Sequence, residues 1–479
     1  MKNISRRSFL KTGAVAAAGL TIVPGSVLGK SFGYTAPSDK LNIAGIGVGG
    51  MGRRNLANMN TENIVALCDV DYADKTFKDY PKAKRFKDWR VMFDEMGKSI
   101  DAIMVATPDH THAGVTAHAI TLGKHCYTQK PLTHSVYESR LLTKLAKKYK
   151  VATQMGNQGN SFDWCRQIAE WIQSGVIGDV YEVHCWTDRP IWPQGLMKPS
   201  DTPKCPKTLD WDLWIGPAQK RPYNPVYTPW NWRGWWDFGT GALGDMACHI
   251  MDPLYWALDL KYPTSVIGSS TLSNLYSPPH AQIVTYTFPA RPPKGNVKMP
   301  EVKVYWYDGG LMPPRPEELK DGQMMGDENG GIIFIGTKGK IMTGCYGMNP
   351  TLLPVSDMEH FNQPKPTIPR VKGGNGDIWS TNAHEQDWIR ACKESPENRT
   401  EASSNFQFSG PFNEMVVMGV LAVRLSGLQG LHRELQWDGE NMRFTNISPN
   451  DKIKIVTVDD FKVIDGDPRF DRRFAEFNA

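Results

Sequence analysis

The chain has 479 residues, of which 40% are hydrophobic and 22% are charged. This length exceeds what one hydrophobic core usually supports, so we expect at least two folded domains, and the composition excludes a disordered or collagen-like chain. The formal net charge is +5, but four positive charges lie within the first eleven residues, so the remainder is close to neutral. Because no basic block or basic helix is left, nucleic acid and anionic membranes are poor candidate partners.

The first 29 residues have the pattern of an export signal. The string SRRSFLK at 5–11 precedes an apolar run at 14–23 that is too short to span a membrane. Residues 1–29 are similar to a twin-arginine signal, so we expect export to the periplasm or an equivalent compartment. Proteins exported by this route generally fold in the reducing cytoplasm. The eight cysteines, which include no C-x-x-C pair, are therefore expected to be mostly free, buried thiols.

From residue 41 onward, short apolar runs alternate with helical patterns, which is typical of a parallel sheet with crossover helices. Strands are predicted at 41–46, 63–68, 101–105, 125–128 and 151–154, and helices at 50–59, 111–122 and 134–149. Together these elements predict a nucleotide-binding α/β domain over residues 38–156.

The pattern changes after this domain. Helices are predicted at 162–174, 243–258, 381–392 and 410–425, and strands at 180–186, 282–288, 302–307, 331–335 and 339–343. A Pro/Trp-rich stretch at 189–241 lacks a regular pattern, and loops of this length in compact domains are usually functional. We expect a second domain over residues 157–479.

The segment GIGVGGMG at 45–52 follows the first predicted strand and opens the first predicted helix. Its glycines permit a tight turn and a close approach to a pyrophosphate, which the helix N-terminus would then face. Asp69 ends the second predicted strand, where a carboxylate binds the adenosine ribose hydroxyls and repels a 2′-phosphate. The sequence therefore predicts a site for NAD, formed by Gly47, Gly49, Gly50, Met51, Gly52 and Asp69.

Three further segments resemble the Gfo/Idh/MocA oxidoreductase family: DAIMVATPDHTH at 101–112, GKHCYTQKP at 123–131 and GTGALGDMACH at 239–249. The resemblance implies a Rossmann domain with a parallel sheet, followed by an α+β domain with a large, mixed and mostly antiparallel sheet. It further implies a homo-oligomer, a dimer or a tetramer, formed through that second sheet. The residues expected to border the cofactor are Thr107, Pro108, His110, His112, Gln129 and Lys130. Asn157 follows the fifth predicted strand, where it is expected either to reach the nicotinamide end or to form an ordinary turn.

The resemblance also indicates the reacting groups. The ammonium of Lys130 can hydrogen-bond a substrate hydroxyl and lower its pKa during hydride removal. The neighbouring Gln129 departs from the glutamate common in the family and carries no charge. Asp245 and His249 are four residues apart on a predicted helix, so they share a face and can bind a polyol or pass a proton. We predict that Lys130, Asp245 and His249 are catalytic, and that no metal is bound, because this pair has no evident third ligand.

The segment PWNWRGWWD at 229–237 leads into that helix. Tryptophan faces can stack on sugar rings and Arg233 can bind hydroxyls or an acidic group, although these tryptophans would equally pack a long loop. We predict that Trp232, Arg233, Asp245 and His249 bind a small carbohydrate. Three functions stay open. The first is oxidation of a sugar, polyol or glycoside by hydride transfer to a retained cofactor. The second is an NAD-dependent glycosidase resembling glycoside hydrolase family 109, which oxidises C3 of the sugar, eliminates the group at C1 and returns the hydride; the third is a non-catalytic sugar-binding protein.

Overall fold

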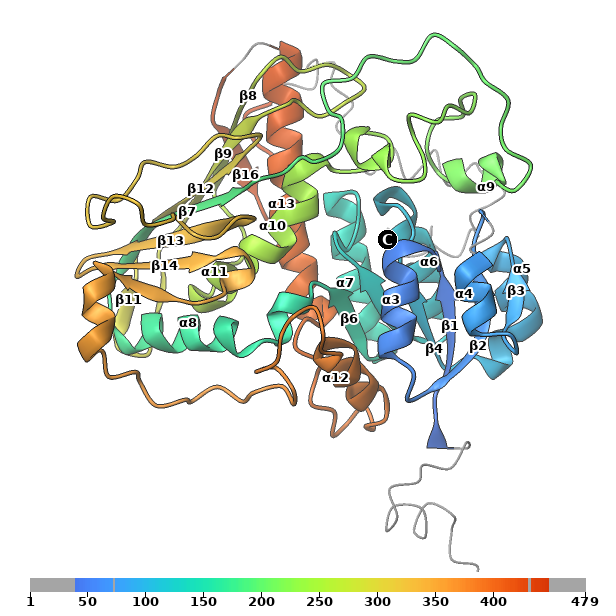
Figure 1. Cartoon of the computed structure of the whole chain (residues 1–479), viewed down its shortest axis with the longest axis horizontal. Helices are drawn as coiled ribbons and strands as arrows, with labels where there is room; N and C mark the ends of the chain where they lie inside the picture. The colour runs from blue at the N-terminus through green and yellow to red at the C-terminus, as the bar shows by residue number, and fades with distance from the viewer. Residues whose placement is uncertain (1–38, 72–73, 430–431, 448–479) are drawn as a thin grey trace, which may run out of the picture.

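The computed structural model describes residues 39–71, 74–429 and 432–447, which form two sheets of different construction (Figure 1). The predicted leader, 1–29, and the last part of the predicted second domain, 448–479, lie outside the described residues. The expected fold class is confirmed: a Rossmann domain with a parallel sheet precedes a domain whose large sheet is mixed and mostly antiparallel.

The first sheet has six parallel strands in the order β3-β2-β1-β4-β5-β6. The strands are β1 (Asn42–Ile46), β2 (Asn63–Cys68), β3 (Lys84–Phe86), β4 (Ala102–Val105), β5 (His125–Gln129) and β6 (Thr153–Gly156). The helices are α3 (Gly50–Asn58), α4 (Asp74–Asp79), α5 (Trp89–Met96), α6 (Asp109–Thr121) and α7 (Val136–Tyr149). The strand order reverses between β1 and β4. The loops that follow these two strands therefore meet at the carboxyl edge, where open α/β sheets bind ligands.

The second sheet has nine strands in the order β15-β14-β13-β7-β12-β9-β8-β16-β17, and its one parallel pair joins β7 to β12. These strands are β7 (Val180–Thr187), β8 (Ser265–Ser270), β9 (Gln282–Phe288), β12 (Val302–Asp308), β13 (Gly330–Gly336), β14 (Lys340–Gly344), β15 (Thr351–Leu353), β16 (Leu435–Asp438) and β17 (Arg443–Phe444). A separate hairpin pairs β10 (Arg291–Lys294) with β11 (Val297–Met299).

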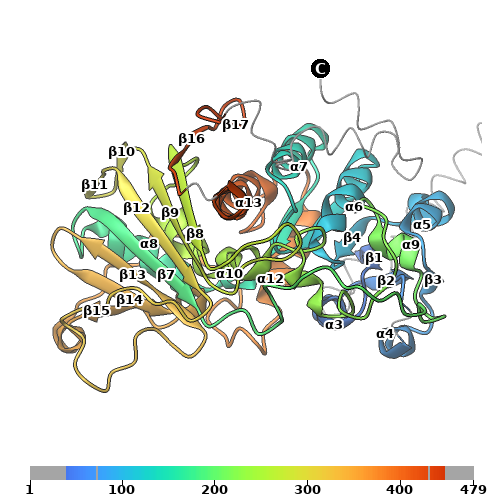
Figure 2. The same cartoon turned by 90° about the horizontal axis from the view of Figure 1, so that it is seen from above.

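Helices join the two sheets into one body. The helix α13 (Phe406–Gln429) lies between α7 of the first domain and β8 of the second sheet (Figure 2). Three helices, α8 (Asp163–Ser174), α10 (Gly241–Ile250) and α11 (Asp252–Ala257), pack together beside the second sheet. The chain then returns to the Rossmann domain, where α12 (Ala383–Cys392) packs against α3, β5 and β6. One hydrophobic cluster includes residues of both sheets, such as Val105 and Trp306, so the two domains share a continuous core.

Several details differ from the predictions. The predicted helix 243–258 is two helices, because Pro253 lies in the first turn of α11 and has no N–H group with which to continue α10. The strand β3 was not predicted, since its three residues are too few to show a pattern. All eight cysteines are unpaired, and all but the partly exposed Cys205 are buried, as expected. No described helix combines the length and the apolar character needed to cross a bilayer.

Candidate active site

The glycine loop between β1 and α3 forms the floor of the candidate cofactor site. Gly47 has φ +74°, and a Cβ atom there would lie 2.6 Å from the backbone of the loop after β4. A Cβ atom at Gly52 would lie 2.0 Å from the carbonyl oxygen of Gly47, so α3 can begin this close to β1 only with glycine. At Gly49 and Gly50 a Cβ atom would meet nothing closer than 4.0 Å. With Met51 they border a cavity, which leaves their backbone open to a pyrophosphate.

Asp69 lies beside this loop at the end of β2. Its Oδ2 atom accepts hydrogen bonds from the amides of Val48, at 2.8 Å, and Gly49, at 3.2 Å, while Oδ1 accepts one from the amide of Asp71 at 3.0 Å. Burial raises the pKa of Asp69 to about 6, although these amides lower it in part. A carboxylate has about four acceptor positions, so one stays free on Oδ1 for a ribose hydroxyl. The residue therefore both holds the glycine loop and can bind the adenosine end of a dinucleotide.

The loop after β4 supplies the next part of the wall. Thr107, Pro108 and His110 line the cavity. His112 does not: its buried ring lies behind the loop, with Nδ1 2.8 Å from the carbonyl oxygen of Pro131 and Nε2 2.8 Å from that of Thr107. Burial lowers the pKa of His112 to about 4. The structure thus places His112 outside the lining of the cavity, where the side chain joins the loop after β4 to the loop after β5.

Residues 188–240, which we call the strap, cross from the second sheet to the edge of the Rossmann domain (Figure 1). The strap contains a short helix, α9 (Trp211–Ile215), and it is tied to the loop after β2: the amide of Asp210 donates to the carbonyl of Val70 at 2.9 Å, and Leu209 forms a β-bridge with Asp71. It is also tied to the loop after β4, since the Nε2 atom of His110 lies 3.2 Å and 3.0 Å from the carbonyl oxygens of Trp214 and Ile215.

The strap has a core of its own, so its position is fixed by packing as well as by these ties. Its buried aromatic and aliphatic side chains form one cluster: Leu209, Trp214, Ile215, Tyr227, Trp232, Trp235 and Phe238. Three of the four tryptophans at 229–237 are buried, and only Trp230, half exposed at 50%, presents its ring to solvent. These tryptophans were expected either to stack on a sugar or to pack the loop, and most of them pack the loop.

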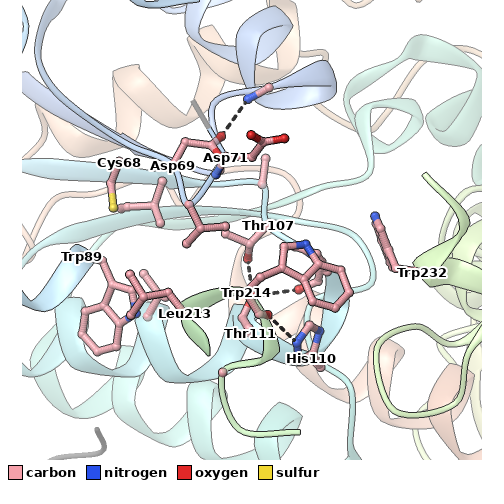
Figure 3. A pocket seen from close by; sticks show the side chains of 18 of the residues that line it. Cys68, Asp69, Asp71, Trp89, Thr107, His110, Thr111, Leu213, Trp214 and Trp232 are labelled. Atoms are coloured by element: carbon pink, nitrogen blue, oxygen red, sulfur yellow. Dashed lines mark hydrogen bonds between the residues drawn. The ribbon is translucent and has the colours of Figure 1, made fainter. Parts of the chain in front are cut away.

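The strap closes a cavity of about 490 Å³ over the carboxyl edge of the parallel sheet. Figure 3 shows Leu213 and Trp214 of the strap beside Thr107 and Thr111, with Asp69 farther along the same cavity. The lining continues to Lys130 at one end, together with Trp230, Trp232 and Arg233. The cavity therefore runs from the predicted ribose site to the predicted reacting lysine.

At that end, Lys130, Asp245 and Arg233 form one charged cluster from three separate segments. The Nζ atom of Lys130 donates to both the carbonyl oxygen and Oδ1 of Asp245, each at 2.8 Å. The Nε atom of Arg233 donates to the same Oδ1 at 3.1 Å. Burial opposes ionisation of Asp245, but the charges of Lys130 and Arg233 outweigh it and hold the pKa of this carboxyl well below its usual range. Asp245 is thus a fixed anion that positions two cations beside the cavity.

His249 lies one turn along α10 from Asp245. Its Nδ1 atom is buried and has no hydrogen-bond partner in the described part of the chain, while its ring centroid lies 4.7 Å from that of Tyr346. Burial, and then the charge of Lys130, lowers the pKa of His249 well below its usual value. The imidazole is therefore neutral at pH 7, and its low pKa makes it a weaker base than expected from the sequence.

Two other predicted residues have different surroundings from those expected. Gln129 borders the cavity, but its Nε2 atom donates to Oδ1 of Asn55 at 2.8 Å, and the Nδ2 atom of Asn55 donates to Glu385 at 2.7 Å. Asn157 is buried away from the cavity, because its Nδ2 atom donates to Asp252 at 3.0 Å and its Oδ1 atom accepts from Ser404 at 2.6 Å. The structure thus does not bring Asn157 to the nicotinamide end.

Sequence reasoning missed two groups of residues at this site. Leu213 and Trp214 of the strap line the cavity, and the unusual length of the strap was the only signal for them. Tyr346 contacts His249 although no motif precedes it, and Trp379, whose ring centroid lies 6.0 Å from that of Tyr346, has no sequence signal.

Known families match three regions of the chain. Residues 41–157 match "Oxidoreductase family, NAD-binding Rossmann fold", and residues 167–270 match "Oxidoreductase family, C-terminal alpha/beta domain". Residues 3–22 match the twin-arginine translocation pathway signal sequence. The first match confirms NAD as the cofactor class, and the third confirms an export signal of the twin-arginine type, which directs the protein to the periplasm.

Curated relatives resemble parts of the chain. The rhizopine catabolism protein MocA of Rhizobium meliloti is 29% identical over 93 residues, which cover 19% of this chain and 29% of the relative. A glycosyl hydrolase family 109 protein of Shewanella sp. (strain W3-18-1) is 24% identical over 208 residues, which cover 38% of this chain and 45% of the relative. In both cases the match spans less than half of the relative's length.

Solved structures share the fold over most of the chain. The WlbA dehydrogenase from Bordetella pertussis, crystallised with NADH and UDP-GlcNAcA, is 15% identical with a TM-score of 0.53, and the match covers 83% of this chain and 99% of that chain. Levoglucosan dehydrogenase in complex with NADH is 17% identical with a TM-score of 0.52, over 81% of this chain and 98% of that one. At these identities the likeness establishes the fold alone.

Proposed function

The chain belongs to the Gfo/Idh/MocA oxidoreductase family, since it carries the NAD-binding and C-terminal domains of that family, and on this premise we propose an exported carbohydrate oxidoreductase that retains its NAD between turnovers. The observation that carries the proposal is the cluster of Lys130, Asp245 and Arg233 at the end of a cavity that begins at Asp69. Lys130 and Arg233 thus border the same space as the cofactor site, while Asp245 holds both of them from behind the lining.

The residues present fit a dinucleotide. Glycine backbone without side chains borders the cavity at Gly49 and Gly50, and Asp69 keeps a free acceptor position for a ribose hydroxyl. Bound NAD would supply a hydride acceptor at the Lys130 end. In the proposed reaction, a C–H bond of the sugar breaks with loss of hydride, its O–H bond breaks with loss of a proton, and a carbonyl group forms.

The protein's own groups handle the oxygen and the proton. Lys130, positioned by Asp245, donates a hydrogen bond to the substrate oxygen and stabilises the negative charge that develops there. The Nδ1 atom of His249, which has no hydrogen-bond partner among the described residues, is the proposed acceptor of the hydroxyl proton. Arg233 fixes Asp245 from the other side, so the lysine cannot rotate away from the cavity without breaking a charged pair.

Retention of the cofactor is supported by the strap. Two loops of the Rossmann domain are tied to it, and its own hydrophobic cluster stabilises its position over the cavity. Because the periplasm has no general soluble NAD(H) pool, an enzyme there must return the hydride within its own cycle. That return is made either to a second substrate or to the same sugar.

The match to glycosyl hydrolase family 109 proteins favours one specific form of the second case. Oxidation at C3 acidifies the C2 proton, elimination expels the group at C1, water adds, and the hydride returns to C3. The common two-carboxylate scheme requires a free carboxyl pair. Asp245 does not offer one, because it is bound by two cations. We therefore hold NAD-dependent glycoside cleavage as the second candidate, and a sugar-binding protein without activity as the third.

The proposal is tested with purified protein whose NAD content is measured by mass spectrometry, followed by a screen of free sugars and p-nitrophenyl glycosides. Lys130→Ala and His249→Ala should each lower turnover about 10²- to 10⁴-fold while NAD stays bound. The exposed His360 gives a matched control, and His360→Ala should act as the wild type. Glycoside cleavage in deuterated water with deuterium at C2 supports the glycosidase form. Full activity in both alanine variants would contradict the assignment.

We also propose that the protein is a homo-oligomer formed through the second sheet. Partly buried apolar side chains, among them Ile283, Tyr305 and Ile335, gather around one small cluster on that sheet. A mass measured by light scattering that equals one chain would exclude this arrangement.

A further inference from the structure

Tyr346 has an unusual backbone at the reaction centre. Its φ and ψ are 61° and 13°, a left-handed conformation that is a true outlier for a bulky side chain. The conformation brings its ring against His249, with centroids 4.7 Å apart, and the Cβ atom of Tyr346 packs against Gly159. Such strain persists where the surrounding structure imposes it, and it is concentrated at functional sites. The phenol has no hydrogen-bond partner among the described residues, so it is available to a ligand.

Trp379 packs against Tyr346 on the side that faces solvent, and we call the two rings the Tyr346–Trp379 wall. Its side chain is 60% exposed, although it is among the largest apolar side chains of the protein. Arg54 of α3 holds it in place: the guanidinium lies 5.0 Å from the ring centroid, and Nη2 donates to the carbonyl oxygens of Ile378, at 3.2 Å, and Trp379, at 3.0 Å. The ring meets Tyr346 edge-on at 6.0 Å. Because Arg54 holds this exposed indole in place, a ligand that stacks on it would not have to order the side chain first.

The position of this wall relative to the cavity is decisive. The contacts continue from Arg233 through Asp245 to His249, and then from His249 to Tyr346 and Trp379. Trp230, half exposed, lies at the cavity end of this line, where Arg233 covers its ring at 4.3 Å. The helix α12, which follows Trp379 in the chain, lies between the second sheet and α3 in both views (Figures 1 and 2). Exposed indoles therefore occur at both ends of the line of reacting groups.

We infer that Trp379 and Tyr346 form a second sugar-binding subsite beyond His249, so that the substrate is a glycoside of at least two rings. This inference rests on the proposed carbohydrate chemistry at Lys130. The apolar face of a pyranose stacks on an indole, while its hydroxyls need polar partners at the ring edge, and the Tyr346 phenol offers such a partner. A single free sugar would occupy the reaction centre alone and leave Trp379 in water.

The test measures binding rather than turnover. Wild-type protein loaded with NAD is titrated with the one-, two- and three-ring members of the cello-, xylo-, malto- and chito-oligosaccharide series, by isothermal calorimetry. For the series that binds, we expect the two- and three-ring members to bind more tightly than the monosaccharide. Trp379→Ala should weaken their binding about 3- to 10-fold and change the monosaccharide less than 2-fold. Trp379→Phe, which keeps an aromatic face, should recover part of the loss.

Tyr181 provides the control, because it is an aromatic residue that is 47% exposed at the beginning of β7. The Tyr181→Ala variant should bind every oligosaccharide as the wild type does. Unchanged binding of all lengths by Trp379→Ala, with its thermal midpoint preserved, would overturn the subsite. A wild type that binds one ring as tightly as three would do so as well. The proposed function is tested by a separate measurement, the exchange of hydride between bound NAD and a sugar, and its absence would contradict that function. The dependence of binding on oligosaccharide length still decides whether the subsite exists.

Discussion

Gly52 lies where α3 passes closest to the loop that precedes it, and its replacement by alanine tests the cofactor site most directly. The new Cβ atom would lie 2.0 Å from the carbonyl oxygen of Gly47 and 3.3 Å from the Cβ atom of Ala106. Since carbon and backbone oxygen do not approach below about 3 Å, the helix start must move by about 1 Å. Gly47 cannot yield instead, because its amide donates to the carbonyl of Cys68 at 2.9 Å.

Two effects follow from this displacement. Overpacking of this kind costs about 1–3 kcal/mol, which should lower the melting midpoint by about 1–3 °C, because the two domains form one large body. The shift also moves the first amides of α3, which would face the pyrophosphate, so NAD affinity should fall at least about tenfold. Gly49→Ala is the matched control. Its Cβ atom would meet only Asp69 at 4.0 Å, so the fold should stay intact while the methyl group occupies cavity space that the dinucleotide needs.

The assay is thermal unfolding of charcoal-treated protein with and without NAD, together with calorimetric titration. With free NAD at 100 times its dissociation constant, the free energy of unfolding of the wild-type protein should rise by about 2.7 kcal/mol. We expect Gly49→Ala to melt as the wild type does without NAD and to lose the gain, whereas Gly52→Ala should melt lower in both conditions. A Gly52→Ala variant with wild-type stability and wild-type affinity would refute the reasoning about this loop.

Three further predictions concern ionisation, the buried amide network and export. Burial raises the pKa of Asp69 to about 6, and its ionised form accepts ribose hydroxyls more strongly than its protonated form. Titrations from pH 7.5 to 5 should therefore show the NAD dissociation constant rising below pH 6 by up to about tenfold, a dependence that Asp69→Asn removes. Gln129→Glu should destabilise the protein by about 1–3 kcal/mol in denaturant unfolding, because the new carboxylate would face the Oδ1 atom of Asn55, whose Nδ2 atom already donates to Glu385. Adding Glu385→Gln allows the Asn55 amide to rotate by about 180° and donate to residue 129, which should restore stability. A reporter joined to residues 1–30 should be exported, and replacing Arg6 and Arg7 by lysine should stop export; unchanged export would point to the general secretory route.

The parts of the site that the sequence predicted depend on local rules. Gly47 and Gly52 are required by a turn between one strand and the next helix, within six residues, and Asp69 ends the neighbouring strand. The pair Asp245 and His249 follows from the helical repeat alone. In each of these cases the element that carries the residue also determines where it lies, so a sequence pattern contains enough information.

The parts that were missed or misplaced depend on partners far away in the chain. Asn157 was expected either at the nicotinamide end or in an ordinary turn; it begins a turn, in which the amide of Asn160 donates to its carbonyl at 2.9 Å, and Asp252, 95 residues later, binds its side-chain amide. His112 bridges two loops by contacts that no helical pattern encodes. Tyr346 reaches His249 because the turn at 345–347, which follows β14, contacts α10. The short α9 likewise depends on a distant contact, since it lies beside a loop about 140 residues earlier. Such contacts follow from the tertiary arrangement, which the sequence pattern does not specify.

Gln129 shows how the two levels meet. The resemblance identified it as a departure from glutamate, and the sequence alone offered no compensation. The structure shows a carboxylate in the same network, on Glu385 of α12, linked to Gln129 through one side-chain amide. Burial raises the pKa of Glu385, and its two asparagine donors oppose that rise only in part, so a second buried carboxylate beside it would be unfavourable. The neutral residue at 129 is therefore the form that this network accepts, and α12 is the element that determines it.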